Sequence, residues 1–292
     1  MADKPFTLTN DELIDILTGV EEEPDWLIPN LIAQGGMVVL VGESHAGKSY
    51  LTYTLSLAMA AGVSALSGLV PAGEPRRVAY FDDENSTQDR NKYLRRSVNG
   101  LGGLKTKRHP KGLDLGLLYE NFYPLHFRLG AEDWMDRAAE CIDIIRPHCL
   151  VFDTAASCFD IADENDNAQA QNTIKGIRHL MKIPEKVASS IVVKHAKTRT
   201  EKGGPRVVRG AKVWKDLSDS MLFLVRASGR PRDGLSPTRL LPDKVRAYGL
   251  PQPLYISPDW TDDARTGLVL RGSYQADREH RAAERADDEE DD

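Results

Sequence analysis

The chain has 292 residues, of which 41 % are hydrophobic and 28 % are charged, and this composition excludes a disordered or fibrous protein. Its 38 Lys and Arg and 44 Asp and Glu give a formal net charge of −6, and the acidic run 287–292 alone accounts for that excess. The net charge is therefore no guide to partners, because it averages a neutral body and an acidic tail.

The cysteines and the apolar stretches exclude two further classes of protein. The three cysteines, Cys141, Cys149 and Cys158, form no CxxC pair, which indicates a reducing, cytoplasmic compartment rather than a secreted disulfide scaffold. The most apolar long stretch, 55–70, is interrupted by serines and glycines and is a poor membrane span. We therefore expect no association with a membrane.

Along the chain, short apolar runs alternate with helical patterns. Continuous apolar runs are typical of strands that are buried on both faces of a parallel sheet, and their alternation with helices predicts an α/β fold. The expected strands are 37–41, 77–81, 149–152, 190–193 and 221–225, and the expected helices are 48–61, 86–98, 131–145 and 167–181. We also expect a short helix after Thr9, glycine-rich exposed loops at 100–116 and 196–210, and short strands at 254–256 and 267–270.

The strongest motif lies between the first of these strands and the following helix. It fits GxxxxGK[ST], in which glycines let backbone N–H groups point at phosphates and the helix N-terminus favours their charge. Lys48 would contact the β- and γ-phosphates, and Ser49 would ligate Mg²⁺; a chance glycine turn is the alternative. The residues expected to bind nucleotide are Gly42, Glu43, Ser44, His45, Ala46, Gly47, Lys48, Ser49 and Tyr50.

Two later strands end in carboxylates. Asp153 follows 149–152 and is either a Walker B residue that holds Mg²⁺ through water or the cap of a turn. The run Asp82-Asp83-Glu84 follows 77–81; one of these residues is a candidate general base, and capping of the helix near Ser86 is the rival role, particularly for Asp83. We predict Ser49, Asp153 and Asp83 as metal ligands.

In this order, the motifs resemble the RecA-like ATPases and, within them, the RepA-like hexameric replicative helicases. The segments that carry the resemblance are Asp25-Trp26-Leu27-Ile28, the phosphate loop, Tyr80-Phe81-Asp82-Asp83-Glu84-Asn85, Asp153-Thr154-Ala155-Ala156-Ser157, Val193-Lys194-His195-Ala196-Lys197 and Arg209-Gly210-Ala211. Lys194 stands where the family often has a second histidine, and Ala211 replaces its usual small hydroxyl residue.

This resemblance implies a RecA-like core with helices on both faces of the sheet and a small C-terminal β segment. It also implies that Glu84 is the catalytic base, that His195 senses the γ-phosphate and that Arg209 reaches a neighbouring subunit's nucleotide. The alternative for His195 is a purely structural histidine whose hydrogen bonds are satisfied at the end of a strand. Lys212 and Lys215 are the alternatives to Arg209. The catalytic set is then Glu84, Lys48, Asp153, His195 and Arg209, with ATP and Mg²⁺ as cofactors.

A basic segment follows, with 14 Lys and Arg against 5 Asp and Glu between residues 194 and 246. In RecA-like rings the loop at 196–210 faces the central channel, where it would contact DNA phosphates without sequence preference. The expected DNA-binding residues are Lys197, Arg199, Lys202 and Arg206; simple solvated loop charges are the alternative.

The expected organisation is an acidic N-terminal segment with a short helix (1–24), a RecA-like ATPase domain (25–257), a strand segment (258–274) and a disordered acidic tail (275–292). The expected function is a Mg²⁺-dependent ATPase acting on single-stranded or branched DNA, as a hexameric ring-forming helicase of bacterial, plasmid or phage origin. A recombination or repair factor with metal-dependent nuclease activity and an ATP-binding loader protein are the alternatives.

Overall fold

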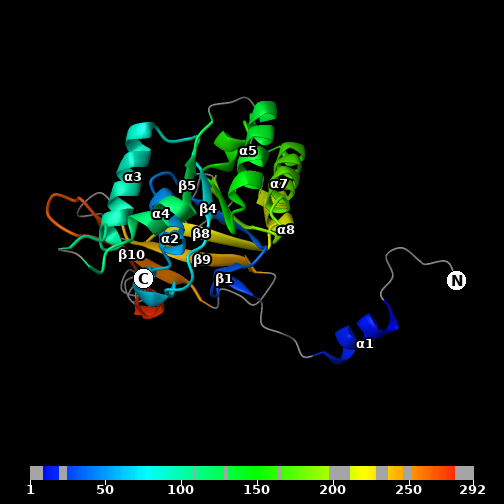
Figure 1. Cartoon of the computed structure of the whole chain (residues 1–292), viewed down its shortest axis with the longest axis horizontal. Coiled ribbons are helices and arrows are strands. Elements are labelled where there is room, and N and C mark those ends of the chain that lie inside the picture. Colours follow the sequence, from blue (N-terminus) through cyan, green and yellow to red (C-terminus); the bar gives the residue numbers. More distant parts are fainter. Residues whose placement is uncertain are drawn as a thin grey trace, which may run out of the picture.

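The central feature of the fold is one large sheet. The computed structural model describes residues 9–19, 25–107, 110–127, 131–163, 166–196, 211–227, 236–245 and 252–279. In these ranges a nine-stranded sheet has the order β11-β10-β9-β8-β3-β7-β6-β4-β5, and helices cover both of its faces (Figure 1). The strands from β8 to β5 are parallel, and β9, β10 and β11 continue the sheet in antiparallel fashion. The predicted α/β class with a mostly parallel central sheet is confirmed.

The elements have the following bounds. The strands of the large sheet are β3 (Met37–Gly42), β4 (Val78–Phe81), β5 (Phe122–Leu125), β6 (Cys149–Phe152), β7 (Ser189–His195), β8 (Ser220–Arg226), β9 (Thr238–Val245), β10 (Leu254–Trp260) and β11 (Leu268–Ser273). A separate pair consists of β1 (Trp26–Ile28) and β2 (Ile32–Ala33). The helices are α1 (Asn10–Thr18), α2 (Lys48–Ala61), α3 (Thr87–Gly100), α4 (Leu115–Asn121), α5 (Ala131–Ile145), α6 (Ala155–Cys158), α7 (Asn167–Met181) and α8 (Ala211–Leu217), and a 3-10 turn, η1, lies at Leu66–Gly68.

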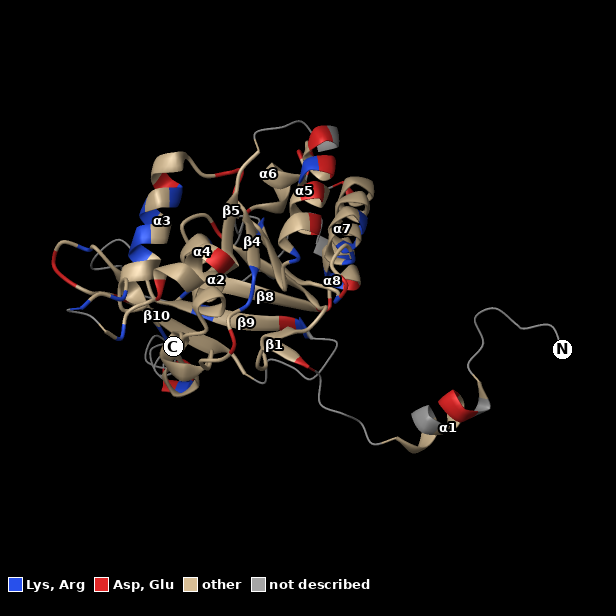
Figure 2. Ribbon diagram, viewed as in Figure 1, with Lys and Arg blue, Asp and Glu red and all other residues tan. Residues whose placement is uncertain are grey.

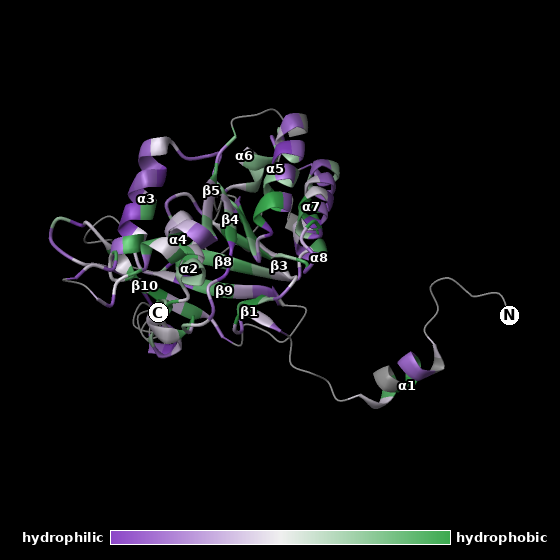
Figure 3. Ribbon diagram, viewed as in Figure 1, coloured by the Kyte–Doolittle hydropathy of each residue, from purple (hydrophilic) through white to green (hydrophobic). Residues whose placement is uncertain are grey.

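The sheet separates two hydrophobic cores. Successive residues of a strand point to opposite faces, so Val38 and Leu40 of β3 join the core under α2, whereas Val39 and Val41 join the core under α5 and α7. All residues of β3, β4 and β6 are buried. This double burial is the reason why these strands read as continuous apolar runs, which Figure 3 shows as hydrophobic arrows between more polar helices.

Some elements lie where no strand or helix was expected. Strand β5 includes Pro124 and β9 includes Pro242, and proline weakens a strand signal because it lacks an N–H donor. β5 is an edge strand, the position where a proline is tolerated. In the expected loop 100–116, Leu113 is buried, and the loop leads directly into α4.

The C-terminal strands belong to the main sheet rather than to a separate segment. β10 pairs with both β9 and β11, and the expected boundary between residues 257 and 258 falls inside β10. Residues 274–279 are helical, and Asp277 is buried and accepts a 2.6 Å hydrogen bond from Arg239 Nε. The start of the expected disordered tail is therefore ordered, whereas residues 280–292, with the acidic run, lie outside the described residues.

The described helices also bear on the question of a membrane. None of them combines the length and the apolar character that a bilayer crossing requires.

The contact between α3 and β11 generates a stability prediction. A Cβ at Gly100, in the last turn of α3, would lie 1.9 Å from the Leu268 carbonyl oxygen, and that backbone atom cannot swing away. We expect Gly100→Ala to lower the free energy of unfolding by about 1–3 kcal/mol through overpacking. The matched control is Gly73→Ala, where a Cβ meets nothing within 4 Å. Urea unfolding of both variants checks this, and equal stabilities would contradict it.

Candidate nucleotide-binding site

The loop between β3 and α2 has the shape of a phosphate cradle. Gly47, immediately before α2, has a φ of +85°, a conformation that favours glycine, and a Cβ there would point into open space. At Gly42, a Cβ would lie 2.8 Å from the Leu224 carbonyl oxygen of β8, so the sheet requires glycine here. Arg226 of β8 donates a 2.8 Å hydrogen bond to the Ser44 carbonyl oxygen and braces the loop.

Lys48 brings a buried positive charge to this cradle. Its Nζ donates to the carbonyl oxygens of Gly42 (2.8 Å) and Glu43 (2.9 Å), so the side chain folds back along its own loop. Burial lowers the pKa of Lys48, and the negative charges of Asp153, Glu84 and Glu43 oppose this shift. The ammonium group of Lys48 therefore lies close enough to the strand ends to interact electrostatically with their carboxylates.

Asp153 faces the cradle from the end of β6. Its side chain accepts a 2.8 Å hydrogen bond from the Tyr80 hydroxyl and another from the Ser49 hydroxyl. Burial, together with the nearby charge of Asp82, raises the pKa of Asp153 to about 6. A buried carboxylate beside the first-turn hydroxyl of α2 is a donor set that suits Mg²⁺, which Ser49 and Asp153 would hold.

Glu84 and His195 meet across the same edge of the sheet. His195 Nε2 lies 3.1 Å from a carboxylate oxygen of Glu84, which links the residues that follow β4 to the end of β7. This hydrogen bond is the main cause that lowers the pKa of Glu84, and a further hydrogen bond from Thr154 acts in the same direction. Glu84 is therefore held ionised near Lys48, the protonation state that a general base needs.

The structure directs Asp83 away from this group, contrary to the metal-ligand prediction. Its carboxylate accepts hydrogen bonds from Trp134 Nε1 (2.5 Å) and the Phe127 backbone N–H (3.0 Å), and it lies 2.6 Å from His126 Nδ1. These partners lie on the face of the sheet covered by α5, so Asp83 links α5 to the residues that follow β5.

The preceding residue, Asp82, is buried and faces α2, on the opposite face of the sheet from Asp83. It accepts hydrogen bonds from the Tyr53 hydroxyl (3.1 Å) and from the backbone and side-chain amides of Asn85 (3.0 and 2.9 Å). Burial raises the pKa of Asp82. The three consecutive carboxylates thus have three different surroundings, and Glu84 is the one that faces the cradle.

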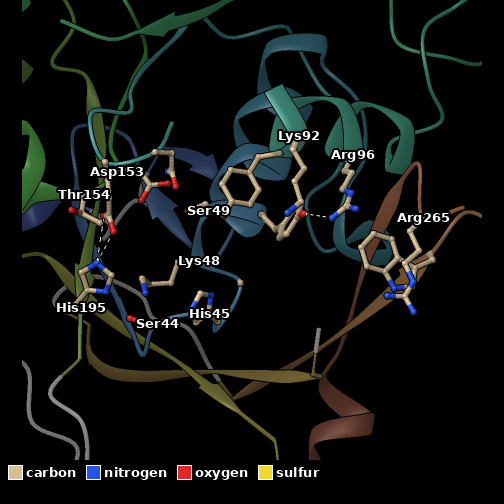
Figure 4. Close-up of a pocket in the computed structure, with 16 residues that line it drawn as sticks. Ser44, His45, Lys48, Ser49, Lys92, Arg96, Asp153, Thr154, His195 and Arg265 are labelled. Carbon is tan, nitrogen blue, oxygen red and sulfur yellow. Dashed lines mark hydrogen bonds and ion pairs between the residues drawn. The ribbon is translucent and has the colours of Figure 1, made fainter. Parts of the chain in front are cut away.

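A cavity of about 390 Å³ joins these groups (Figure 4). Of the predicted nucleotide-binding residues, Gly42, Glu43 and Ala46 do not line the cavity directly. The cavity also includes residues that the sequence did not single out for this site, among them two from the C-terminal hairpin of β10 and β11. Its lining consists of Ser44, His45, Gly47, Lys48, Ser49, Tyr50, Glu84, Asn85, Lys92, Tyr93, Arg96, Asp153, Thr154, His195, Trp260 and Arg265.

The sequence held only a partial signal for the additional residues. Lys92 and Arg96 stand four residues apart on α3 and so lie on one helical face. Trp260 and Arg265 carried no local signal, because they reach the cavity only through the packing of the β10–β11 hairpin against α3, which is distant in the sequence.

The predicted finger residue and the predicted DNA-binding residues all belong to the segment 196–210. Arg209, Lys197, Arg199, Lys202 and Arg206 lie outside the described residues.

Comparison with known proteins agrees with the geometry of the cradle. The family model described as an AAA domain matches residues 2–201, about two-thirds of the chain. The chain belongs to this family. The AAA domain assigns it to the P-loop ATPases, without extending to the RepA-like helicases in particular. No curated protein matches the chain.

The raised pKa of Asp153 predicts a pH-dependent cost in stability. The pKa of Asp153 is about 6 in the folded protein and about 4 in the unfolded chain, so the folded state binds this proton more tightly. The stability that this proton binding contributes is fully present below pH 4 and is lost as the pH rises through 6. The loss amounts to about 3 kcal/mol. We expect the stability of Asp153→Asn relative to the parent chain to increase by up to this amount between pH 4 and pH 8.

Urea unfolding at both pH values, in EDTA and without nucleotide, measures this difference. Asp136→Asn, which removes an exposed carboxylate from α5, is the control for loss of charge alone. A difference between Asp153→Asn and the parent chain that does not change with pH would contradict the prediction.

Proposed function

We propose that this AAA-family protein is a Mg²⁺-dependent ATP hydrolase that acts on DNA as a ring-forming helicase or translocase. The observation that carries the hydrolytic part is the Glu84–His195 pair, which faces Lys48 and Asp153 across one cavity. A cradle that only bound nucleotide would not need an ionised carboxylate positioned by a histidine beside the phosphate-binding lysine.

In this proposal, each side chain has one task. The loop N–H groups and Lys48 bind the phosphates, and Lys48 exchanges its two carbonyl acceptors for phosphate oxygens. Ser49 and Asp153 would hold Mg²⁺, which would supply positive charge to the β- and γ-phosphates. Glu84 orients the attacking water and accepts its proton, while His195 keeps the Glu84 carboxylate in position and contacts the γ-phosphate.

The DNA part of the proposal rests on charge. The segment 194–246 carries an excess of positive charge, and Figure 2 shows a second concentration of Lys and Arg along α3. Positive charge of this kind supports binding to the phosphate backbone without base preference. The resemblance to RepA-like helicases supports a hexameric ring in which Arg209 reaches the neighbouring subunit's nucleotide.

The two alternative functions have less support. A nuclease would need carboxylates that converge on a metal, but Asp83 points away from Asp153, and the described residues contain no cluster of three or more His, Cys, Asp or Glu with metal-binding geometry. A loader that only binds ATP would leave the Glu84–His195 pair without a task.

Two substitutions test the hydrolytic assignment. We expect Lys48→Ala to abolish ATP hydrolysis while the circular dichroism spectrum stays unchanged. Glu84→Gln should lower kcat by about 10²–10⁴-fold, because it removes the general base, and should leave ATP binding largely intact. Glu140→Gln, an exposed site on α5, is the matched control. Normal turnover in Lys48→Ala or Glu84→Gln would refute the corresponding role.

A second prediction concerns DNA. Single-stranded DNA should stimulate ATP hydrolysis, and replacing Arg199, Lys202 and Arg206 together with Gln should remove the stimulation and reduce the salt dependence of DNA binding, since three phosphate contacts are lost. If the triple variant binds DNA like the parent chain, the loop has no part in binding.

Unwinding of a tailed duplex distinguishes the remaining functions. The reaction is run with ATP and Mg²⁺ and, in parallel, with Mg²⁺ alone, and the products are separated on native and denaturing gels. Strand displacement that requires ATP supports the helicase proposal. Shortened strands without ATP would indicate a nuclease, and intact duplex under both conditions would indicate the loader.

A further inference from the structure

The end of the cavity opposite the phosphate cradle has its own chemistry. Arg96 and Arg265 lie at one end in Figure 4, whereas Asp153 and His195 lie at the other. Lys92 of α3 lies beside Arg96 and also lines the cavity. Of the described residues that line the cavity, the carboxylates are Glu84 and Asp153, which both belong to the cradle end. The distant end is therefore rich in hydrogen-bond donors.

An aromatic ring orients the two guanidinium groups. The Arg96 Cζ lies over the Trp260 ring at 4.9 Å from its centroid, and the Arg265 Cζ lies at 5.7 Å. Arg96 also donates a 2.8 Å hydrogen bond to the Tyr50 hydroxyl, and Tyr50 is in edge contact with Tyr93 at 4.7 Å between centroids. Attraction to the face of an indole restrains a guanidinium, so this end holds an aromatic ring and two planar groups that carry hydrogen-bond donors.

A nucleobase matches these surfaces. Its ring is planar, stacks on aromatic side chains and on guanidinium planes, and carries acceptor atoms at its edge. A nucleotide whose phosphates occupy the cradle extends its base away from Lys48, and Tyr50, in the first turn of α2, connects the two ends of the cavity.

We propose that Arg96, Trp260 and Arg265 form the subsite that binds the base of the nucleotide. This inference rests on the proposed nucleotide-binding function and adds the residues that recognise the base. Trp260 and Arg265 lie beyond residue 201, outside the part of the chain that the AAA domain matches. The C-terminal hairpin thus completes a site whose phosphate end belongs to the family's domain.

The turn that carries Arg265 is itself well defined. Asp262 accepts hydrogen bonds from the Thr266 backbone N–H (3.0 Å) and from its hydroxyl, and Thr261 N–H donates to the Gly267 carbonyl oxygen (3.0 Å). The Asp262 carboxylate is therefore held within the turn, and Arg265 reaches the cavity from a turn that these hydrogen bonds define.

The test compares two ligands that differ only beyond the phosphates. ATP and inorganic tripolyphosphate are titrated into the full chain by isothermal calorimetry, each in EDTA, which prevents the Mg²⁺-dependent hydrolysis of ATP. The subsite predicts that the parent chain binds ATP more tightly than tripolyphosphate. Trp260→Ala and Arg265→Ala should weaken ATP binding by about 5- to 150-fold, the range for loss of one stacked base, and leave tripolyphosphate binding unchanged.

Matched variants separate the possible failures. Arg271→Ala changes an exposed arginine of the same hairpin, which pairs with Asp259 rather than lining the cavity, and should bind both ligands like the parent chain. Lys48→Ala should weaken both ligands. Because Trp260 also packs against the core, Arg265→Ala provides the result if Trp260→Ala does not fold.

Two outcomes would overturn the subsite alone: unchanged ATP binding in Arg265→Ala, or an equal loss for ATP and tripolyphosphate, which would show that the arginine binds phosphate. Failure of the parent chain to bind either ligand would overturn the proposed function, and the subsite with it.

Discussion

The buried ammonium group of Lys48 constrains the arrangement of the site around it. Burial disfavours the positive charge of Lys48 and the negative charge of Asp153. It therefore lowers the pKa of Lys48 and raises the pKa of Asp153. Both stay close because β3, β4, β6 and β7 are parallel, and the carboxyl ends of parallel strands meet at one edge of a sheet. The fold thus gathers opposite charges that would be costly to bury one by one.

The residues beneath this edge are organised to hold the carboxylates in place. The Tyr80 hydroxyl donates to Asp153 and is itself in hydrogen-bond contact with Thr52, and the Tyr80 ring stacks on Tyr53 at 4.3 Å between centroids. Tyr53 in turn donates to Asp82. The two stacked tyrosines between α2 and β4 therefore pack the helix on the sheet and, through their hydroxyl groups, also hold the carboxylates of Asp82 and Asp153 in place. Because these hydroxyls are buried, replacing one ring changes both the packing and the electrostatics.

Local pattern was sufficient for the phosphate cradle and for three of the helices. The bounds of α2, α5 and α7 follow from helical spacing, and the P-loop is recognisable because its glycines and lysine act within eight adjacent residues. The roles of Asp82, Asp83 and Glu84 could not be separated in this way, because strand alternation ends with β4 and the turn that follows decides which carboxylate faces the lysine. The inward position of Trp260 was also beyond local pattern, since it depends on the packing of the C-terminal hairpin against α3, which lies far away in the sequence.

The pairing of β3 has a consequence for how the protein comes to be folded. β3 carries the P-loop at its end, yet its neighbours in the sheet are β7, through pairs such as Met37 with Ser190, and β8, through pairs such as Val38 with Ser220. During synthesis the P-loop leaves the ribosome long before either neighbour, and contacts so distant in sequence form slowly. The phosphate cradle is thus made before the two strands that hold β3 in the sheet, and it becomes a binding surface only after they have been made.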